Sequence, residues 1–199
     1  MNLPNKLTLA RVLLVPVMSW LILADYIPHN FLWAGLVFGA AALTDMFDGK
    51  IARSRNLITD FGKLADPVAD KLLVAAAIIC FIEIGLCSSW VLIIVLAREF
   101  AVTSMRMVAA SKGRVIPANM WGKVKTVSQM IAIIAIFVFQ WAIQLIDTGI
   151  FGVMKSGVFD TVVQWANILG QIFLWITAAL TLISGIVYIV QNKDMIGSM

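Results

Sequence analysis

Six long apolar runs occupy most of this 199-residue chain. Apolar residues make up 61% of the sequence and charged residues only 13%, well outside the averages for soluble globular proteins. A bilayer core of about 30 Å is crossed by about 20 apolar residues in a helix. The runs therefore predict an all-α polytopic membrane protein, folded as a single domain over residues 1–199. We expect six transmembrane helices, near 12–27, 31–47, 66–86, 90–110, 126–146 and 165–190.

The segment before the first run has a different pattern. Residues 2–11 can form a short amphipathic helix with Leu3, Leu7 and Ala10 on one face. Such a helix lies in the membrane interface. We therefore predict an N-terminal amphipathic interfacial helix, and no cleavable signal peptide, because no small-residue cleavage site follows the first run.

Cysteine and histidine chemistry is sparse in this chain. Cys80 and Cys87 share one apolar run. Seven residues of helix separate their backbones by about 10 Å, too far for a disulfide bond. The only histidine is His29, beside Pro28. Histidine-based triads and His-rich zinc sites are therefore not expected.

Lysines and arginines gather on one side of the predicted topology. With six spans both termini share a side, and the loops on the opposite side carry only Lys155. Basic loops face the cytoplasm. We therefore expect a multi-pass protein of the inner (cytoplasmic) membrane, with the stretch from Asp45 to Asp70 facing the cytoplasm and no nucleic-acid partner. The basic residues on that side are Lys6, Arg11, Lys50, Arg53, Arg55, Lys63, Lys112, Arg114, Lys123, Lys125 and Lys193.

Four aspartates stand in two pairs around the polar stretch between the second and third runs. Asp45 and Asp48 are three residues apart, and Asp66 and Asp70 are four apart, so each pair shares one face of a helix. Carboxylates at a membrane boundary are costly and mark a functional site. Four of them together repel one another unless cations bind between them. Oxygen-only ligands suit Mg²⁺, Mn²⁺ or Ca²⁺ and disfavour zinc. We predict a metal centre of two ions, which can clamp a diphosphate.

Small residues and an arginine lie between the two pairs. Gly49 follows Asp48 directly and Ala52 comes one turn later, so a ligand can approach the helix backbone there. Gly62 suits a close approach or a turn between two helices. Arg53 can bind a phosphate through two hydrogen bonds. Together with the metal centre, these residues predict a nucleotide diphosphate as ligand.

A structural interpretation of the same aspartates stays open at this point. Asp66-Pro67 has the form of an ordinary helix start, with aspartate as the N-cap and proline at the first position. Asp45 and Asp48 could pair with neighbouring basic residues as interface charges. The full set, with the small residues and the arginine, favours a ligand site.

The complete spacing resembles a known family motif, that of the CDP-alcohol phosphotransferases. The likeness covers about residues 2–130, where the segments LPNKLTLAR, DPVADKLL, AREFAVTSMR and WGKVKT look like the bacterial phosphatidylglycerophosphate synthase branch. The last two apolar runs contain few residues that distinguish this family. The motif, matched without a departure, is Asp45-x-x-Asp48-Gly49-x-x-Ala52-Arg53, eight residues, Gly62, three residues, Asp66, three residues, Asp70.

The resemblance implies an enzyme of anionic phospholipid biosynthesis. It would transfer the phosphatidyl group of CDP-diacylglycerol to glycerol 3-phosphate and release CMP. The family also implies a homodimer among membrane lipids, and two divalent ions, Mg²⁺ or Mn²⁺, held by the four aspartates. Asp70 would act as general base on the acceptor hydroxyl. The residues implied to hold the CDP moiety are Asn5, Thr8, Gly49, Ala52, Arg53, Thr59 and Gly62.

The acceptor is expected at basic residues outside the motif. Arg106, Arg114, Lys123 and Lys125 cluster at the cytoplasmic ends of the fourth and fifth runs, where an acceptor phosphate would be attracted. The tendency of cytoplasmic ends to be basic explains them equally well residue by residue. Arg98 and Glu99 lie too deep in the fourth run to belong to a loop. We expect them to pair with each other or to face the cavity.

Two other functions remain open from the sequence. A sister enzyme could use serine, inositol phosphate or phosphatidylglycerol as acceptor. A divalent-cation transporter could use the carboxylates as its ion site, but it leaves Arg53 and the glycines unexplained. It would also need acidic residues across several spans, whereas here they gather at one membrane face.

Overall fold

The computed structural model consists of six α-helices and describes residues 3–54, 60–111, 120–149 and 156–192, with no strand among them. It describes no side chain for residues 3–6, 45–54, 60–67, 70 and 156. The prediction of an all-α chain is confirmed over this part of the protein. The helices are α1 (Leu3–Leu23), α2 (Asn30–Ser54), α3 (Asp60–Glu83), α4 (Ser89–Ser111), α5 (Met120–Asp147) and α6 (Ser156–Gln191).

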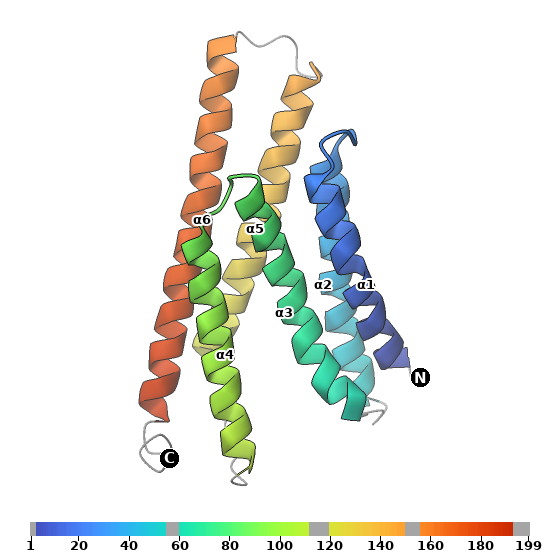
Figure 1. Ribbon diagram of the computed structural model, residues 1–199, viewed down its shortest axis with the longest axis vertical. Helices are drawn as coiled ribbons and strands as arrows, with labels where there is room; N and C mark the ends of the chain where they lie inside the picture. Colours follow the sequence, from blue (N-terminus) through green and yellow to red (C-terminus); the bar gives the residue numbers. More distant parts are fainter. Residues whose placement is uncertain (1–2, 55–59, 112–119, 150–155, 193–199) are drawn as a thin grey trace.

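The helices run alternately up and down, so both chain termini lie at one end of the bundle (Figure 1). The lower end in this view, which we call the motif end, contains the end of α2 and the start of α3. The ends of α4 and α6 and the start of α5 also point that way (Figure 1). This arrangement is the one that six alternating helices require for the acidic motif and the basic segments to share a face.

Three phenylalanines join α2, α3 and α5 in the core. The ring centroids of Phe38 and Phe137 are 5.8 Å apart, and those of Phe81 and Phe137 are 5.3 Å apart. All three rings are buried. Gly35 allows the approach, because a Cβ there would lie 3.2 Å from the Cβ of Phe137. Small residues at helix contacts are typical of bundles that pack without a hydrophobic driving force from water.

The helices around the motif are longer than the apolar runs predict. Helix α2 continues to Ser54, seven residues past the expected end at Phe47, and α3 begins at Asp60 instead of Asp66. The expected boundaries lie where hydropathy falls, but lysine and arginine are good helix formers although they are charged, and alanine is the best of all. The helix therefore continues beyond the apolar stretch, and the described parts of the polar segment, 49–54 and 60–64, are helical.

The first helix corrects the prediction of a separate amphipathic segment. Residues 3–23 form one continuous helix, with no break near Arg11. Its buried positions are Thr8, Arg11, Val15, Met18 and Ile22, at alternating spacings of three and four, while Ala10 is exposed. Of the predicted apolar face, Leu7 is half-buried and Ala10 is exposed, while the side chain of Leu3 lies outside the described ones. Polar side chains in an apolar surrounding need protein partners, so they turn inward.

Two of the six helices are long and apolar enough to cross a membrane by length and composition, over Met120–Asp147 and Gly157–Gln191. Shorter apolar helical stretches cover Leu7–Leu23 and Asn30–Thr44. This composition and the many exposed apolar side chains on α6 describe a membrane protein.

The cysteine prediction is confirmed. Cys80 and Cys87 are both free and buried. They lie on either side of the end of α3, where the chain turns through Gly85 at a positive φ of 77°. Their role is that of apolar side chains in the core.

Candidate functional site

The motif residues lie on two consecutive helix ends. Asp45, Asp48, Gly49, Ala52 and Arg53 lie within the last three turns of α2, which ends at Ser54. The other motif positions lie in the first three turns of α3, which starts at Asp60: they are Gly62, Asp66 and Asp70. Both helix ends belong to the motif end of the bundle (Figure 1). The backbone thus brings the two halves of the motif to one place, although their side chains lie outside the described ones.

Asp66 is an interior residue of its helix. Helix α3 begins six residues earlier, at Asp60, and Pro67 continues it. An N-cap residue must precede the helix, because its side chain binds the free N–H groups of the first turn. The interpretation of Asp66-Pro67 as a helix start is therefore wrong, and capping does not explain that carboxylate. The start of α3 also makes Gly62 a helical position and not a turn.

Helix α1 is fastened to α2 just before the motif. The fully buried Arg11 donates a hydrogen bond from Nε to the carbonyl oxygen of Ala41, at 3.3 Å. Ala41 is one turn ahead of Asp45. Thr8, one of the predicted CDP-binding residues, is buried one turn before Arg11 on the same face of α1. This face of α1 is thus held against α2 close to the motif.

A network of charged side chains links α4, α5 and α6. Nη1 of Arg98 lies 3.3 Å from Oε1 of Glu99, and Nη2 donates to Oγ of Ser184 at 2.7 Å. Lys125 forms a second ion pair with the same Glu99 oxygen. Only 4% of the Lys125 side chain and 17% of the Glu99 side chain are exposed. The prediction that Arg98 and Glu99 pair is confirmed.

A lysine connects this network to α3. Nζ of Lys71, the residue after Asp70, donates to Oγ1 of Thr103 on α4 at 2.6 Å. Lys71 also interacts electrostatically with Glu99. Within this network one carboxylate thus faces three cations, so its described side chains carry a net positive charge, which suits an anionic ligand.

The predicted acceptor residues separate into different environments. Arg106 in the last part of α4 and Lys123 in the first turn of α5 are exposed at the motif end. Lys125 is buried and already paired with Glu99. Arg114 and Thr59 lie outside the described residues, and the side chain of Asn5 lies outside them too. The structure therefore leaves Arg106 and Lys123 as the described basic residues that are open to a ligand.

One polar feature of the structure was not predicted from the sequence. Thr177, Thr181, Ser184 and Tyr188 are all buried, on one face of α6. We call them the α6 polar stripe. Their spacings of four, three and four are helical periodicity inside an apolar run, and this pattern could have identified them. They face the neighbouring helices, as the contact between Arg98 and Ser184 shows.

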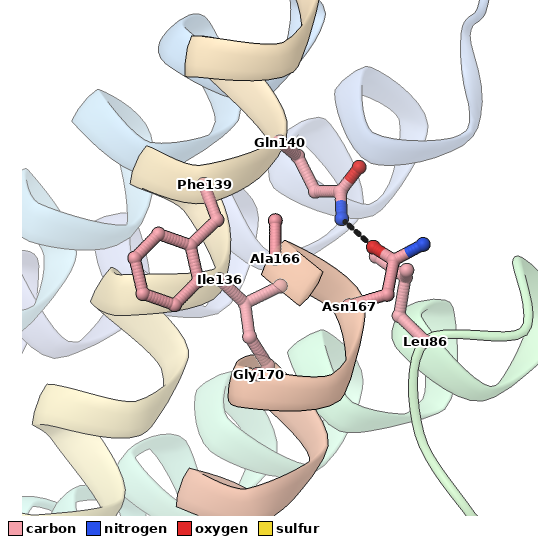
Figure 2. A pocket seen from close by; sticks show the side chains of 7 residues that line it. All are labelled: Leu86, Ile136, Phe139, Gln140, Ala166, Asn167 and Gly170. Carbon is pink, nitrogen blue, oxygen red and sulfur yellow. Dashed lines mark hydrogen bonds between the residues drawn. The ribbon is translucent and has the colours of Figure 1, made fainter. Parts of the chain in front are cut away.

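A small hollow lies between α5, α6 and the turn after α3 (Figure 2). Nε2 of Gln140 donates to Oδ1 of Asn167 at its edge, at 2.7 Å. None of the residues that line it is ionisable, so it offers no acid–base or metal chemistry. The lining residues are Leu86, Ile136, Phe139, Gln140, Ala166, Asn167 and Gly170.

Among the described side chains, no three groups of histidine, cysteine, aspartate or glutamate lie together in a way that could hold a metal ion. The four motif aspartates are not among those side chains.

Fold and site together define a helical membrane protein with paired aspartates on two adjoining helix ends. Residues 1–183 match the CDP-alcohol phosphatidyltransferase family. The chain belongs to this family and is a phosphatidyltransferase.

Named relatives cover two thirds of the chain or more. It is 37% identical to the CDP-diacylglycerol–glycerol-3-phosphate 3-phosphatidyltransferase of Bacillus subtilis, over 97% of this chain and 96% of that protein. It is 39% identical to the protein of the same name from Rickettsia felis, over 94% of this chain and 93% of the relative. A third relative of that name, from Pseudomonas fluorescens, is 39% identical over 67% of this chain and 71% of its own length.

Proposed function

We propose that this protein transfers the phosphatidyl group of CDP-diacylglycerol to glycerol 3-phosphate, forming phosphatidylglycerophosphate and CMP. One observation carries the proposal. The complete motif lies on the adjoining ends of α2 and α3, in a chain that matches relatives named for this reaction along nearly their full length.

The donor set at the motif fits a divalent metal. Asp45, Asp48, Asp66 and Asp70 supply only oxygen ligands, from positions that the backbone brings to one end of the bundle. Such a set suits Mg²⁺ or Mn²⁺, and four carboxylates suit two ions. When bound, the ions would neutralise the diphosphate of the donor and the charge on the CMP leaving group.

The residues of the chain perform the remaining steps. Asp70 accepts the proton of the 1-hydroxyl of glycerol 3-phosphate. The oxygen then forms a bond to the β-phosphorus of CDP-diacylglycerol, the one that carries the diacylglycerol. The bond from that phosphorus to the bridging oxygen breaks, and CMP leaves with the electron pair. The small residues Gly49, Ala52 and Gly62 let the CDP moiety approach the helix backbones.

Further residues of the proposed CDP site bind the phosphates and the cytidine of the donor. Arg53 binds a phosphate of the donor, and a guanidinium does so with two hydrogen bonds. Thr59, Asn5 and Thr8 complete the site, with Thr8 supported by its buried position beside the fastening of α1 to α2.

The proposed setting is the inner membrane, with six spans and the motif end in the cytoplasm. The concentration of lysine and arginine at the motif end supports this orientation. A homodimer, as the family implies, is part of the proposal. Substrates and lipids would then reach the same membrane face.

The assay that tests the proposed function measures CMP release. Purified protein with Mg²⁺ or Mn²⁺, CDP-diacylglycerol and glycerol 3-phosphate should release CMP and form one phosphatidylglycerophosphate for each CMP. Removal of the metal with EDTA should stop the reaction, and added metal should restore it. A panel with serine, inositol phosphate and phosphatidylglycerol tests the sister activities. If no alcohol led to CMP release, the proposed enzymatic function would be wrong, and divalent-cation transport would be the remaining hypothesis.

The two lysines at the start of α5 should respond differently to replacement. Lys123→Ala should raise the KM for glycerol 3-phosphate about tenfold or more, because an exposed cation that binds the acceptor phosphate is lost. Its thermal midpoint should barely change. Lys125→Ala should instead lower the thermal midpoint, because Glu99 loses a buried partner. Steady-state kinetics and thermal unfolding in detergent measure both. An unchanged KM in Lys123→Ala would assign that lysine to membrane topology alone.

A further inference from the structure

Tyr188 is the last member of the α6 polar stripe, and its hydroxyl is buried without a partner. The residue is 3% exposed, and the hydroxyl forms no hydrogen bond within the described part of the chain. Two other members of the stripe have partners, since Thr181 donates to the carbonyl of Thr177 at 2.7 Å and Ser184 accepts from Arg98. The Thr177 hydroxyl, deeper in α6, is also buried without a partner among the described residues. A buried hydroxyl that lacks a partner is costly. A ligand atom bound here would supply the missing hydrogen-bond partner.

The charges around this hydroxyl indicate which kind of atom it is. Tyr188 interacts electrostatically with the guanidinium groups of Arg98 and Arg106. A guanidinium only donates hydrogen bonds, so neither arginine can accept the tyrosine proton. The missing partner is an acceptor, and two nearby positive charges favour an anion.

Measured along the bundle axis, Tyr188 lies at about the same level as the aspartate motif. Helices α4 and α6 run in the same direction (Figure 1), and the contact from Arg98 to Ser184 fixes their register. Tyr188 lies about 6 Å beyond Ser184, and Thr103 about 7.5 Å beyond Arg98. Thr103 accepts the hydrogen bond from Lys71, which follows Asp70. The tyrosine and the proposed base therefore lie at similar heights.

Arg106 is placed to share the same ligand. It lies two turns beyond Arg98 on α4, and side chains on a helix lean back toward its N-terminus. The exposed guanidinium of Arg106 thus approaches the height of Tyr188 from the open motif end. An anion at this place would meet the Tyr188 hydroxyl and the Arg106 guanidinium.

We propose that the Tyr188 hydroxyl donates a hydrogen bond to the phosphate of the acceptor alcohol beside Arg106, and so determines the preference for a phosphorylated acceptor. This assignment rests on the proposed function. It places the acceptor phosphate inside the bundle, against α6, and directs the acceptor hydroxyl toward the end of α3 that carries Asp70.

The test compares Tyr188→Phe with the wild-type protein in the CMP-release assay. Tyr188→Phe removes only the hydroxyl, so the KM for glycerol 3-phosphate should rise about tenfold, as expected when one charge-assisted hydrogen bond is lost. The inhibition constant of inorganic phosphate, competing with the acceptor, should rise by a similar factor. The KM for CDP-diacylglycerol and the thermal midpoint should stay within about twofold and 2 °C of wild type, respectively.

The other tyrosine of the chain gives a matched control. Tyr26 is 75% exposed, between α1 and α2, and Tyr26→Phe should change none of these values. Equal acceptor KM and phosphate inhibition in Tyr188→Phe and wild type would overturn the proposal. So would a lower thermal midpoint with both KM values altered, because that result assigns Tyr188 to packing. Failure of the wild-type protein to use glycerol 3-phosphate would overturn the proposed function itself. The activity of the wild-type protein is therefore measured before that of any variant.

Discussion

Asp70→Asn should lower the turnover number by about a hundredfold to ten-thousandfold, the usual contribution of a general base. Asparagine has nearly the same shape as aspartate and keeps one oxygen, but it cannot accept the proton of the acceptor hydroxyl at neutral pH. Affinity for CDP-diacylglycerol should fall little, because the other three aspartates and Arg53 remain. CMP release and equilibrium binding of the CDP-lipid, measured on the same preparation, separate the two effects.

The control for this substitution is Asp147→Asn. Asp147 is exposed at the last position of α5, away from the motif end, and its replacement should leave both measurements unchanged. Near-normal turnover in Asp70→Asn would refute the role as a base. Loss of CDP-lipid binding together with turnover would limit Asp70 to holding metal.

Glu99→Gln should destabilise the protein by about 3 kcal/mol, the lower part of the range for breaking a buried ion pair. Lys125 would keep its charge at a position where only 4% of its side chain is exposed, and Arg98 would lose its only acidic partner within the described residues. The thermal midpoint in detergent should fall by about 6–12 °C for a chain of this size. Glu83→Gln is the matched control, because Glu83 is exposed at the end of α3.

A second substitution distinguishes the ion pair from general disturbance. Glu99→Gln combined with Lys125→Met should cost less than the sum of the single changes, because the unpaired buried cation is then removed as well. Additive losses would contradict a direct pair, and a midpoint unchanged in Glu99→Gln would show that solvent already screens these charges.

The sequence predicts the number and order of the helices but not their ends near the motif. Apolar runs mark the part of a helix that lies in an apolar surrounding, whereas the backbone hydrogen bonds of α2 continue through Lys50 and Arg53 to Ser54. The same reason applies to α3, which begins among polar residues at Asp60. The aspartate motif itself is a local spacing, and its placement on two adjoining helix ends follows from short-range sequence.

Contacts distant in the sequence could not be predicted. Lys125 looked like one of several loop cations, and its partner Glu99 lies 26 residues away on another helix. Arg98 reaches Ser184, 86 residues further along the chain. Which of these charges is buried depends on how the helices pack, and that packing is decided by shape as much as by hydropathy.

The hydrogen bond from Arg11 to Ala41 also bears on how the chain enters the membrane. The apolar part of α1 beyond Arg11 spans only residues 12–23, which is about 18 Å and shorter than the hydrocarbon core. A lone helix would have to carry a charged guanidinium into that core, at high cost. The hydrogen bond from Arg11 to the Ala41 carbonyl forms only when α2 is alongside. Biogenesis should therefore insert the first two helices together, as one helical hairpin, and a chain that stops translation after α1 should fail to integrate.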